Sequence, residues 1–278
     1  MEAGSRPGVF PLSTRKNLSN YLIECLEKKS QAQLPSNTIP DFSLSDAYSI
    51  AVEIKEKREK KEEKVAGIKV GFTNKTIWNK YSVNAPIYGF MYSSTVLNDD
   101  QSFVPEKFLE PKFEPEIFFK LSKKPRSEMS DMDLISCCNS FGIGVELVQS
   151  IYEGWTFTLP DTVAGFGLHG QYKILQEMAI PSEQIARLEI INDLKNFHLT
   201  LGKNNTVLEH GNSKNILEES PLAALRSYTK FCEKNSDWLI LNAPVTTGTI
   251  TDAYDISKSD IFSFELDRLV KNKFVVKF

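Results

Sequence analysis

Three acidic side chains in strand-like apolar segments are the residues in this chain best suited to do chemistry. The segment "FEPEIFF", residues 113–119, holds Glu114 and Glu116 two positions apart among aromatic residues. Side chains alternate between the two faces of a strand, so both carboxylates would point the same way. The segment "GIGVELVQ", residues 142–149, holds Glu146 within a similar apolar run. Because ionised carboxylates are rarely buried without a partner, we expect a positive group beside them.

The residues alone leave two interpretations of these glutamates open. Three oxygen ligands with no neighbouring His or Cys suit a hard cation, Mg²⁺ or Mn²⁺. Such an ion would keep coordination positions free for water or for a chelating substrate. The alternative is three separate glutamates that are exposed or paired with surface cations, since Glu-x-Glu is common in strands.

A lysine occurs in a similarly unusual setting. In "GIKVGF", residues 67–72, Lys69 shares one strand face with Gly67 and Gly71, which leaves space beside its side chain. Lys69 is either an exposed strand lysine or a functional group. In the second case its ammonium would hold a substrate carboxylate or move protons, with a pKa lowered by burial or by a nearby cation.

The elements that would position these residues fall into two parts. Residues 1–63 form a predicted N-terminal helical region, because apolar residues recur at helical spacing in 15–29 and 45–64. Ser43 or Ser45 is the expected N-cap of the second helix. Residues 64–278 form the second part, in which strand patterns dominate.

Strand patterns after residue 64 do not alternate regularly with helices. We predict strands at 65–73, 111–121, 141–151, 186–193 and 272–278, and helices at 129–138 and 220–234. Pro221 suits the first turn of the last helix. This arrangement predicts an α+β fold around an antiparallel or mixed sheet, rather than a doubly wound parallel sheet.

Composition narrows the class of protein. Of 278 residues, 25% are charged and the formal net charge is −3, so neither nucleic acid nor a membrane surface is an expected partner. We find no apolar run near the ~20 residues that cross a bilayer, and the first 13 residues lack the apolar core of a signal peptide. The adjacent Cys137 and Cys138 suit neither a disulfide nor a zinc site. Reduced thiols and a cytoplasmic location are therefore expected.

Seven short motifs together resemble a known family. They occur in the order and rough spacing of the 2-keto-4-pentenoate hydratase / 2-oxo-3-hexenedioate decarboxylase family, in the fumarylacetoacetate hydrolase-like superfamily. The motifs are "GIKVGFTNKTIW", "NAPIYGFMYSSTVL", "EPKFEPEIFFKL", "GVELVQSIYEGW", "DTVAGFGLHG", "NILEESPLAAL" and "VTTGTITDAYDI". The resemblance implies a mixed β-roll like the C-terminal domain of fumarylacetoacetate hydrolase, with N-terminal helices, in a homo-oligomer.

The same resemblance assigns roles to individual residues. It makes the three glutamates ligands of Mg²⁺ or Mn²⁺: Glu114, Glu116 and Glu146. It implies catalytic roles for a lysine, an aspartate and a histidine: Lys69, Asp161 and His169. It implies that a turn lines the substrate pocket, namely Thr247, Gly248 and Thr249, whose hydroxyls and backbone N–H groups fit a carboxylate. An ordinary loop is the alternative for that turn.

The chain departs from the better-known hydratases at three places. Ile87 follows Pro86 where they carry an acidic residue, and Gln149-Ser150 stands where they carry Asp-Ser. Residues 165–170, "GFGLHG", replace D-N-A-S-S, so His169 would replace a serine near the substrate. We expect His169 to be either a proton shuttle or a hydrogen-bonded structural histidine.

The resemblance implies a metal-dependent lyase. The preferred activity is hydration of a 2-hydroxy-dienoic acid of the 2-keto-4-pentenoate type to a 4-hydroxy-2-oxoacid. Decarboxylation of a 2-oxo-3-enedioate is the alternative, and loss of the acid at Ile87 would favour it. A non-catalytic oligomer that binds 2-oxoacids is a further alternative, although the glutamates and Lys69 argue against it. Hydrolysis of an acylpyruvate is disfavoured, because the first 63 residues show no His-Glu dyad.

Overall fold

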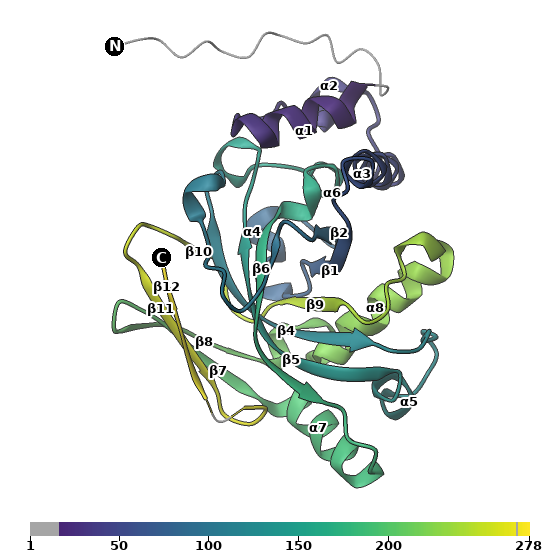
Figure 1. Ribbon diagram of the computed structural model, residues 1–278, viewed down its shortest axis with the longest axis vertical. Helices are drawn as coiled ribbons and strands as arrows, with labels where there is room; N and C mark the ends of the chain where they lie inside the picture. The colour runs from purple at the N-terminus through teal and green to yellow at the C-terminus, as the bar shows by residue number, and fades with distance from the viewer. Residues whose placement is uncertain (1–16, 271) are drawn as a thin grey trace.

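The computed structural model describes residues 17–270 and 272–278 (Figure 1). Its strands are β1 Val65–Gly71, β2 Ile87–Tyr92, β3 Val96–Leu97, β4 Lys112–Leu121, β5 Cys138–Val148, β6 His169–Ala179, β7 His198–Lys203, β8 Thr206–Asn212, β9 Pro244–Thr249, β10 Tyr254–Asp255, β11 Ile261–Leu266 and β12 Lys273–Lys277. Its α-helices are α1 Leu18–Lys28, α2 Pro35–Thr38, α3 Leu44–Glu59, α4 Trp78–Tyr81, α5 Asp131–Ile135, α6 Leu159–Ala164, α7 Gln184–Asn196 and α8 Pro221–Lys234. The expected α+β class with a mixed sheet is confirmed.

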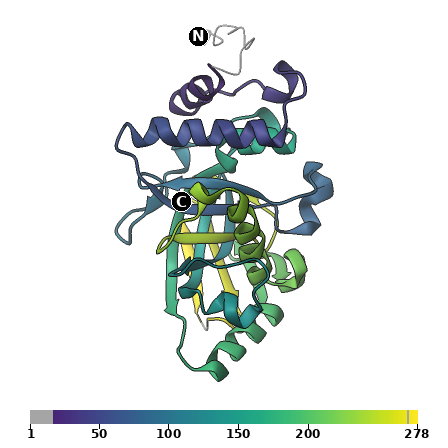
Figure 2. The ribbon, with the colours of Figure 1, turned by 90° about the vertical axis from the view of Figure 1, so that its right-hand side faces the viewer.

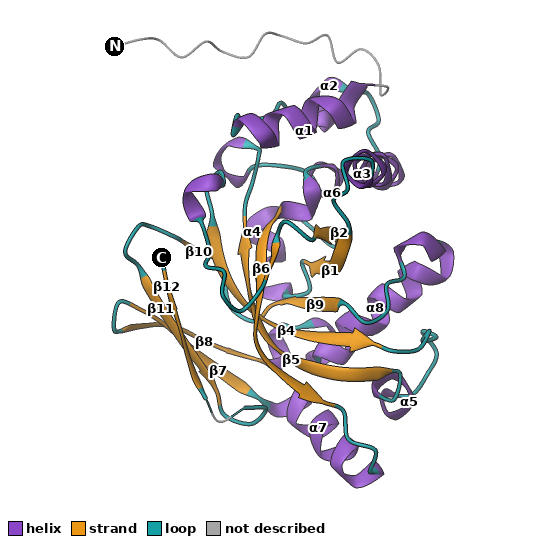
Figure 3. Cartoon of the chain, viewed as in Figure 1, coloured by secondary structure: helices purple, strands orange, loops and turns teal. Residues whose placement is uncertain are grey.

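The larger sheet is strongly curved and carries the three glutamates (Figure 3). Its strand order is β2-β1-β9-β4-β5-β6-β3, with β10 paired to β4. The pairs β1–β9 and β3–β6 are parallel, whereas the other pairs are antiparallel. The central strands β4 and β5 are buried on both faces over most of their length, so side chains on them are shielded from water.

A second sheet of four strands, in the order β12-β11-β7-β8, packs against β4. Phe113 of β4 stacks on Phe262 of β11 with ring centroids 4.3 Å apart, and Phe264 and Phe278 complete the contact. These rings lie on the face of β4 opposite to Glu114 and Glu116, as strand alternation requires. The apolar face of β4 therefore holds the strand rigidly while its other face presents carboxylates.

The N-terminal helices lie at one end of the larger sheet (Figures 1 and 2). The expected helices are confirmed as α1 and α3, and Ser43 is the N-cap of α3 in a capping box with Asp46. Their apolar faces are buried, with Leu22 and Ile54 at most 2% exposed. Residues 1–16 of the predicted helical region lie outside the described residues. We retain as a proposal that 1–63 and 64–278 form separate units.

One predicted strand is wrong. Residues 186–193 lie within helix α7. This segment is rich in helix formers, and its apolar residues satisfy a helix better than a strand. Ile191 and Leu194 are buried three positions apart, whereas Ile185 and Leu188 are 75% and 52% exposed. The predicted helices at 129–138 and 220–234 are confirmed as α5 and α8, with Pro221 in the first turn of α8.

Candidate active site

Strands β4 and β5 bring the three glutamates together. In their antiparallel pairing Glu114 lies opposite Glu146, and Glu116 lies opposite Gly144. Carboxylate oxygens of all three lie within 4.8 Å of one another, and the side chains are 8%, 1% and 0% exposed in chain order. Gly144 has to lack a side chain here, because a Cβ would lie 2.1 Å from the hydroxyl of Tyr172. The three glutamates are therefore buried together, and the alternative of three separate surface glutamates is excluded.

The charge of this cluster is poorly compensated. Burial, and then the neighbouring Glu146, raise the pKa of Glu116 to about 8. Burial raises the pKa of Glu114 well above its ordinary value, against the opposing effect of Lys69. Both carboxyl oxygens of Glu116 are buried without a hydrogen-bond partner among the described residues. Buried polar atoms almost always have a partner, so these oxygens fit a bound cation.

Lys69 supplies the positive group expected beside the carboxylates. Its Nζ lies 3.2 Å from Oε2 of Glu146, and the side chain is 3% exposed. Burial alone would lower the pKa of Lys69, but the three glutamates outweigh it and raise the pKa. The lowering expected from a nearby cation stays a prediction. With all groups ionised, three carboxylates and one ammonium leave a formal charge of −2, which one divalent cation would neutralise.

Glycines make room for the Lys69 side chain. A Cβ at Gly89 would lie 3.3 Å from Cγ of Lys69, and one at Gly71 would lie 3.5 Å from its Cε. Gly167 has a φ of 63° and contacts Gly89 through Cα. The sequence suggested space beside Lys69 from Gly67 and Gly71, but Gly67 faces Met91 and Pro244 instead.

His169 contacts the cluster from the first residue of β6. Its Nδ1 lies 2.8 Å from Oε1 of Glu146, and its Nε2 lies 2.8 Å from Oγ1 of Thr95. Burial and the nearby Lys69 hold the pKa of His169 well below its usual range, so the ring is neutral. A carboxylate can only accept, so Nδ1–H donates to Glu146 and Nε2 accepts from the Thr95 hydroxyl.

These contacts favour a positioning role for His169 over proton transfer. Both ring nitrogens are occupied inside the protein, and His169 is absent from the residues that line the pocket described below. Its hydrogen bond holds one oxygen of Glu146 and leaves the other directed at Lys69. Thr95 was not foreseen from the sequence, since a threonine in a turn carries no signal by itself. The proton-shuttle role of His169 stays an untested prediction.

We expect His169→Ala to weaken divalent-metal binding by about 10- to 100-fold, because a metal-ligating carboxylate that loses its hydrogen-bond donor is less well oriented. His169→Asn keeps a donor near the position of Nδ1 and should recover part of the loss. Titration of the protein with Mn²⁺, followed by electron paramagnetic resonance of the free ion, measures both affinities without any turnover. Equal affinities for His169→Ala and wild type would contradict the positioning role.

Asp161 is not brought into the glutamate cluster. Its carboxylate accepts hydrogen bonds from the backbone and hydroxyl of Thr158, in a capping box at the start of α6. It also accepts from the backbone and hydroxyl of Ser36, which ties α2 to α6. All four bonds are between 2.6 and 2.9 Å long. They favour a structural role, and the catalytic role predicted for Asp161 stays untested.

The turn at Thr247, Gly248 and Thr249 is a bulge in β9 next to Glu116. Glu116 pairs with Thr249, and the register shifts between Glu116 and Phe118. Gly248 has a φ of 83°, and a Cβ there would lie 2.0 Å from Oγ1 of Thr73. The hydroxyls of Thr247 and Thr249 both donate to backbone carbonyls. Of the three residues only Thr249 lines the pocket, so Thr247 braces the bulge.

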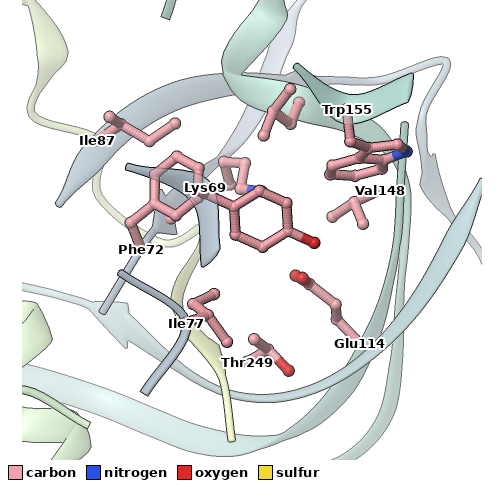
Figure 4. A pocket seen from close by; sticks show the side chains of 11 residues that line it. Lys69, Phe72, Ile77, Ile87, Glu114, Val148, Trp155 and Thr249 are labelled. Carbon is pink, nitrogen blue, oxygen red and sulfur yellow. The ribbon is translucent and has the colours of Figure 1, made fainter. Parts of the chain in front are cut away.

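A pocket opens onto this cluster at Glu114 (Figure 4). Its polar side chains are Lys69, Tyr81, Glu114 and Thr249. Its remaining side chains are Phe72, Ile77, Ile87, Val148, Trp155 and Leu168. A small molecule held near Glu114 would thus have carboxylates and an ammonium at one end and apolar groups at the other. Such a pocket, with a few converging polar groups, is typical of a small-molecule site.

Several known proteins are similar to this chain in sequence. No protein-family model matches the chain. The 4-oxalocrotonate decarboxylase of Pseudomonas sp. (strain CF600) is 26% identical over 226 residues, which cover 81% of this chain and 82% of the relative. The 2-hydroxypent-2,4-dienoate hydratase of Pseudomonas putida is 28% identical over 173 residues, which cover 62% and 74%. The chain is similar in sequence to these decarboxylases and hydratases.

Solved structures show that the fold of this chain is also similar to that of a 4-oxalocrotonate decarboxylase. The structure of 4-oxalocrotonate decarboxylase from Pseudomonas putida G7, complexed with magnesium and adipate, has a TM-score of 0.83 at 22% identity. The match covers 95% of this chain and 98% of that chain. A putative fumarylacetoacetate hydrolase family protein from Yersinia pestis CO92 and a putative fumarylacetoacetate isomerase/hydrolase from Oleispira antarctica share the fold more distantly, with TM-scores of 0.52 and 0.51. The resemblance and fold class expected from the sequence are confirmed.

Proposed function

We propose that this protein is a divalent-metal-dependent lyase that hydrates a 2-hydroxy-dienoic acid of the 2-keto-4-pentenoate type to a 4-hydroxy-2-oxoacid. The observation that carries the proposal is the buried cluster of Glu114, Glu116 and Glu146 with Lys69, at the polar end of an otherwise apolar pocket. The hydratases among its relatives act on 2-hydroxypenta-2,4-dienoate and 2-hydroxyhexa-2,4-dienoate, as their names state. A scaffold protein would have no use for such a cluster, whose burial is costly.

The three glutamates would hold Mg²⁺ or Mn²⁺, because an all-oxygen ligand set suits hard cations. The solved relative named above contains magnesium. When bound, such an ion would stabilise negative charge on the C2 oxygen of a chelated 2-oxoacid. Glu146, held by His169 at one oxygen, would keep its ligand geometry fixed during turnover.

Lys69 would act on the same C2 oxygen. Its ammonium would donate a hydrogen bond to that oxygen while the C2 hydroxyl loses its proton, and in net terms this is the proton that C5 gains as the dienol becomes the 2-oxo form. Protonation at C5 and addition of water across C3 and C4 then give the 4-hydroxy-2-oxoacid. Glu114 lies at the pocket wall and is the carboxylate nearest to incoming water. Thr249, which also lines the pocket, would help to position the substrate.

Decarboxylation of a 2-oxo-3-enedioate is the second candidate, and a specific observation favours it. Ile87, which stands where better-known hydratases carry an acid, is fully buried and lines the pocket. Once a terminal carboxylate is bound, an apolar wall would remove its water and so favour its loss as CO₂, although the same desolvation opposes its binding. The proteins similar to this chain include a decarboxylase as well as a hydratase.

One panel assay separates the candidates. The protein, with Mg²⁺ or Mn²⁺, is given 2-hydroxypenta-2,4-dienoate and, separately, 2-oxohex-3-enedioate. Loss of dienol absorbance without CO₂ release supports the hydratase, whereas CO₂ release from the dicarboxylate supports the decarboxylase. If neither compound is consumed with either metal, both proposed activities are wrong.

We also propose that the protein is a cytoplasmic homo-oligomer. The cysteines of the described residues, Cys25, Cys137, Cys138 and Cys232, are all free and buried, as suits a reducing compartment. None of the helices in the described part of the chain is long and apolar enough to span a membrane. Light scattering after size exclusion would give the number of subunits.

A further inference from the structure

The far end of the pocket has an aromatic and aliphatic wall that the reaction itself does not require. Tyr81 stands at its centre, with ring centroids 6.0 Å from Phe72, 6.1 Å from Trp155 and 5.8 Å from Phe157. Ile87 and Leu168 also line the pocket. Figure 4 shows Phe72, Ile87 and Trp155 around the space above Glu114 and Thr249.

Charged groups that could pair with a second substrate carboxylate are missing from this wall. Among the described residues that line the pocket, Lys69 is the single cation, and it lies against Glu146. Burial, together with Asp252 and Glu114, raises the pKa of Tyr81, so its phenol stays protonated and uncharged. The wall therefore offers at most one neutral hydroxyl.

The nearest other cations are already neutralised. Lys80 lies over the ring of Tyr81, 5.3 Å from its centroid, and its Nζ bonds Asp252 at 2.7 Å. Lys112 lies over the ring of Trp155, 5.2 Å from its centroid, and pairs with Asp255. Each of these two lysines is therefore already paired with an aspartate, and neither lysine lines the pocket.

We propose that this wall selects substrates whose terminal group, at the end remote from the 2-oxoacid, is uncharged and apolar. The protein would therefore accept a methyl- or alkyl-terminated acid and reject the corresponding dicarboxylate, which would exclude the decarboxylase candidate. A terminal carboxylate placed against Phe72, Ile87 and Trp155 would lose its water without gaining a partner, which is strongly unfavourable. This inference rests on the proposed function, because it takes the glutamate end of the pocket as the place where the 2-oxoacid group binds.

The test uses inert ligands of equal chain length, so that it does not depend on turnover. Calorimetry of the Mn²⁺-loaded protein compares 2-oxopentanoate, which ends in a methyl group, with 2-oxoglutarate, which ends in a carboxylate. We expect 2-oxopentanoate to bind on the order of 100-fold more tightly. Equal or tighter binding of 2-oxoglutarate would overturn the inference while leaving the 2-oxoacid site intact. Failure of both ligands to bind would overturn the 2-oxoacid site, and the inference with it.

A change of the wall should reduce the preference. Ile87→Lys places an ammonium within the wall and should bring the two affinities at least about 10-fold closer. Lys80→Met is the matched control, because it alters a cation behind Tyr81 and should leave the ratio unchanged. If Ile87→Lys does not fold, the wild-type comparison still decides. If the folded Ile87→Lys variant keeps the wild-type ratio of the affinities for 2-oxopentanoate and 2-oxoglutarate, the wall does not determine that ratio.

Discussion

Replacing Glu116 by Gln should abolish measurable Mn²⁺ binding and lower turnover by about 1,000-fold or more, while the protein stays folded. Glu116 has both carboxyl oxygens buried without a hydrogen-bond partner in the described part of the chain, so a cation is the partner they fit. Gln has the same shape but no charge, and it presents one oxygen in place of two. Loss of a metal that stabilises an enolate removes the main electrostatic contribution to catalysis.

The measurement has a stability readout that is independent of activity. Because burial raises the pKa of Glu116 to about 8, the folded state without metal holds its proton more tightly than the unfolded state does. The stability of the wild-type protein in EDTA should therefore fall as pH rises from about 4.5 to about 8. Glu116→Gln should flatten this fall. Glu128→Gln, at an exposed ion pair with Arg126, is the control and should change neither property. Mn²⁺ affinity of Glu116→Gln equal to that of wild type would rule out the glutamate cluster as the metal site.

Replacing Lys69 by Met should lower kcat by about 100- to 10,000-fold without weakening metal binding. The Lys69 ammonium lies 3.2 Å from Glu146 and is the cation beside the cluster that faces the pocket. Its removal deletes the group that can hold a proton at the C2 oxygen. It also removes a positive charge that repels a dication, so Mn²⁺ should bind as tightly as before or more tightly.

The effects of Lys69→Met on kcat and on Mn²⁺ affinity distinguish a catalytic role of Lys69 from a structural one. A structural role would show as lost metal affinity or lost folding, whereas the catalytic role would show as lost kcat with metal retained. The variant is purified with Mn²⁺ present, because three carboxylates without Lys69 are destabilising in its absence. Lys80→Met is the matched control, since Lys80 lies outside the pocket. Near-normal kcat in Lys69→Met would exclude Lys69 from the reaction.

Sequence patterns located the acidic residues but not their mutual contact. The period of two in residues 113–119 correctly placed Glu114 and Glu116 on one face of β4. The pairing of Glu114 with Glu146 depends on the register of β4 and β5, which local patterns do not set. The motif resemblance supplied that link.

Contacts between distant segments account for what was missed. Asp161 begins a family motif, which led to the prediction of a catalytic role. In the structure its carboxylate accepts hydrogen bonds from Ser36, which lies 125 positions earlier in the chain. The sequence left His169 as either a proton shuttle or a hydrogen-bonded structural histidine, because the partner of its Nε2, Thr95, lies 74 positions earlier. Residues 186–193 were mistaken for a strand because the four apolar residues in eight do not select one period when the packing partner is unknown.

The close packing of Gly89 and Gly167 beside Lys69 has an evolutionary consequence. A Cβ at Gly89 would lie 3.3 Å from Cγ of Lys69, but also 3.2 Å from Cα of Gly167 and 3.3 Å from the carbonyl oxygen of Phe166, so selection on Gly89 acts through the backbone as well as through Lys69. In a descendant that had abandoned turnover and lost the lysine, Gly89 would therefore stay constrained. A natural sequence with Gly89 replaced but Gly167 kept would contradict this dependence.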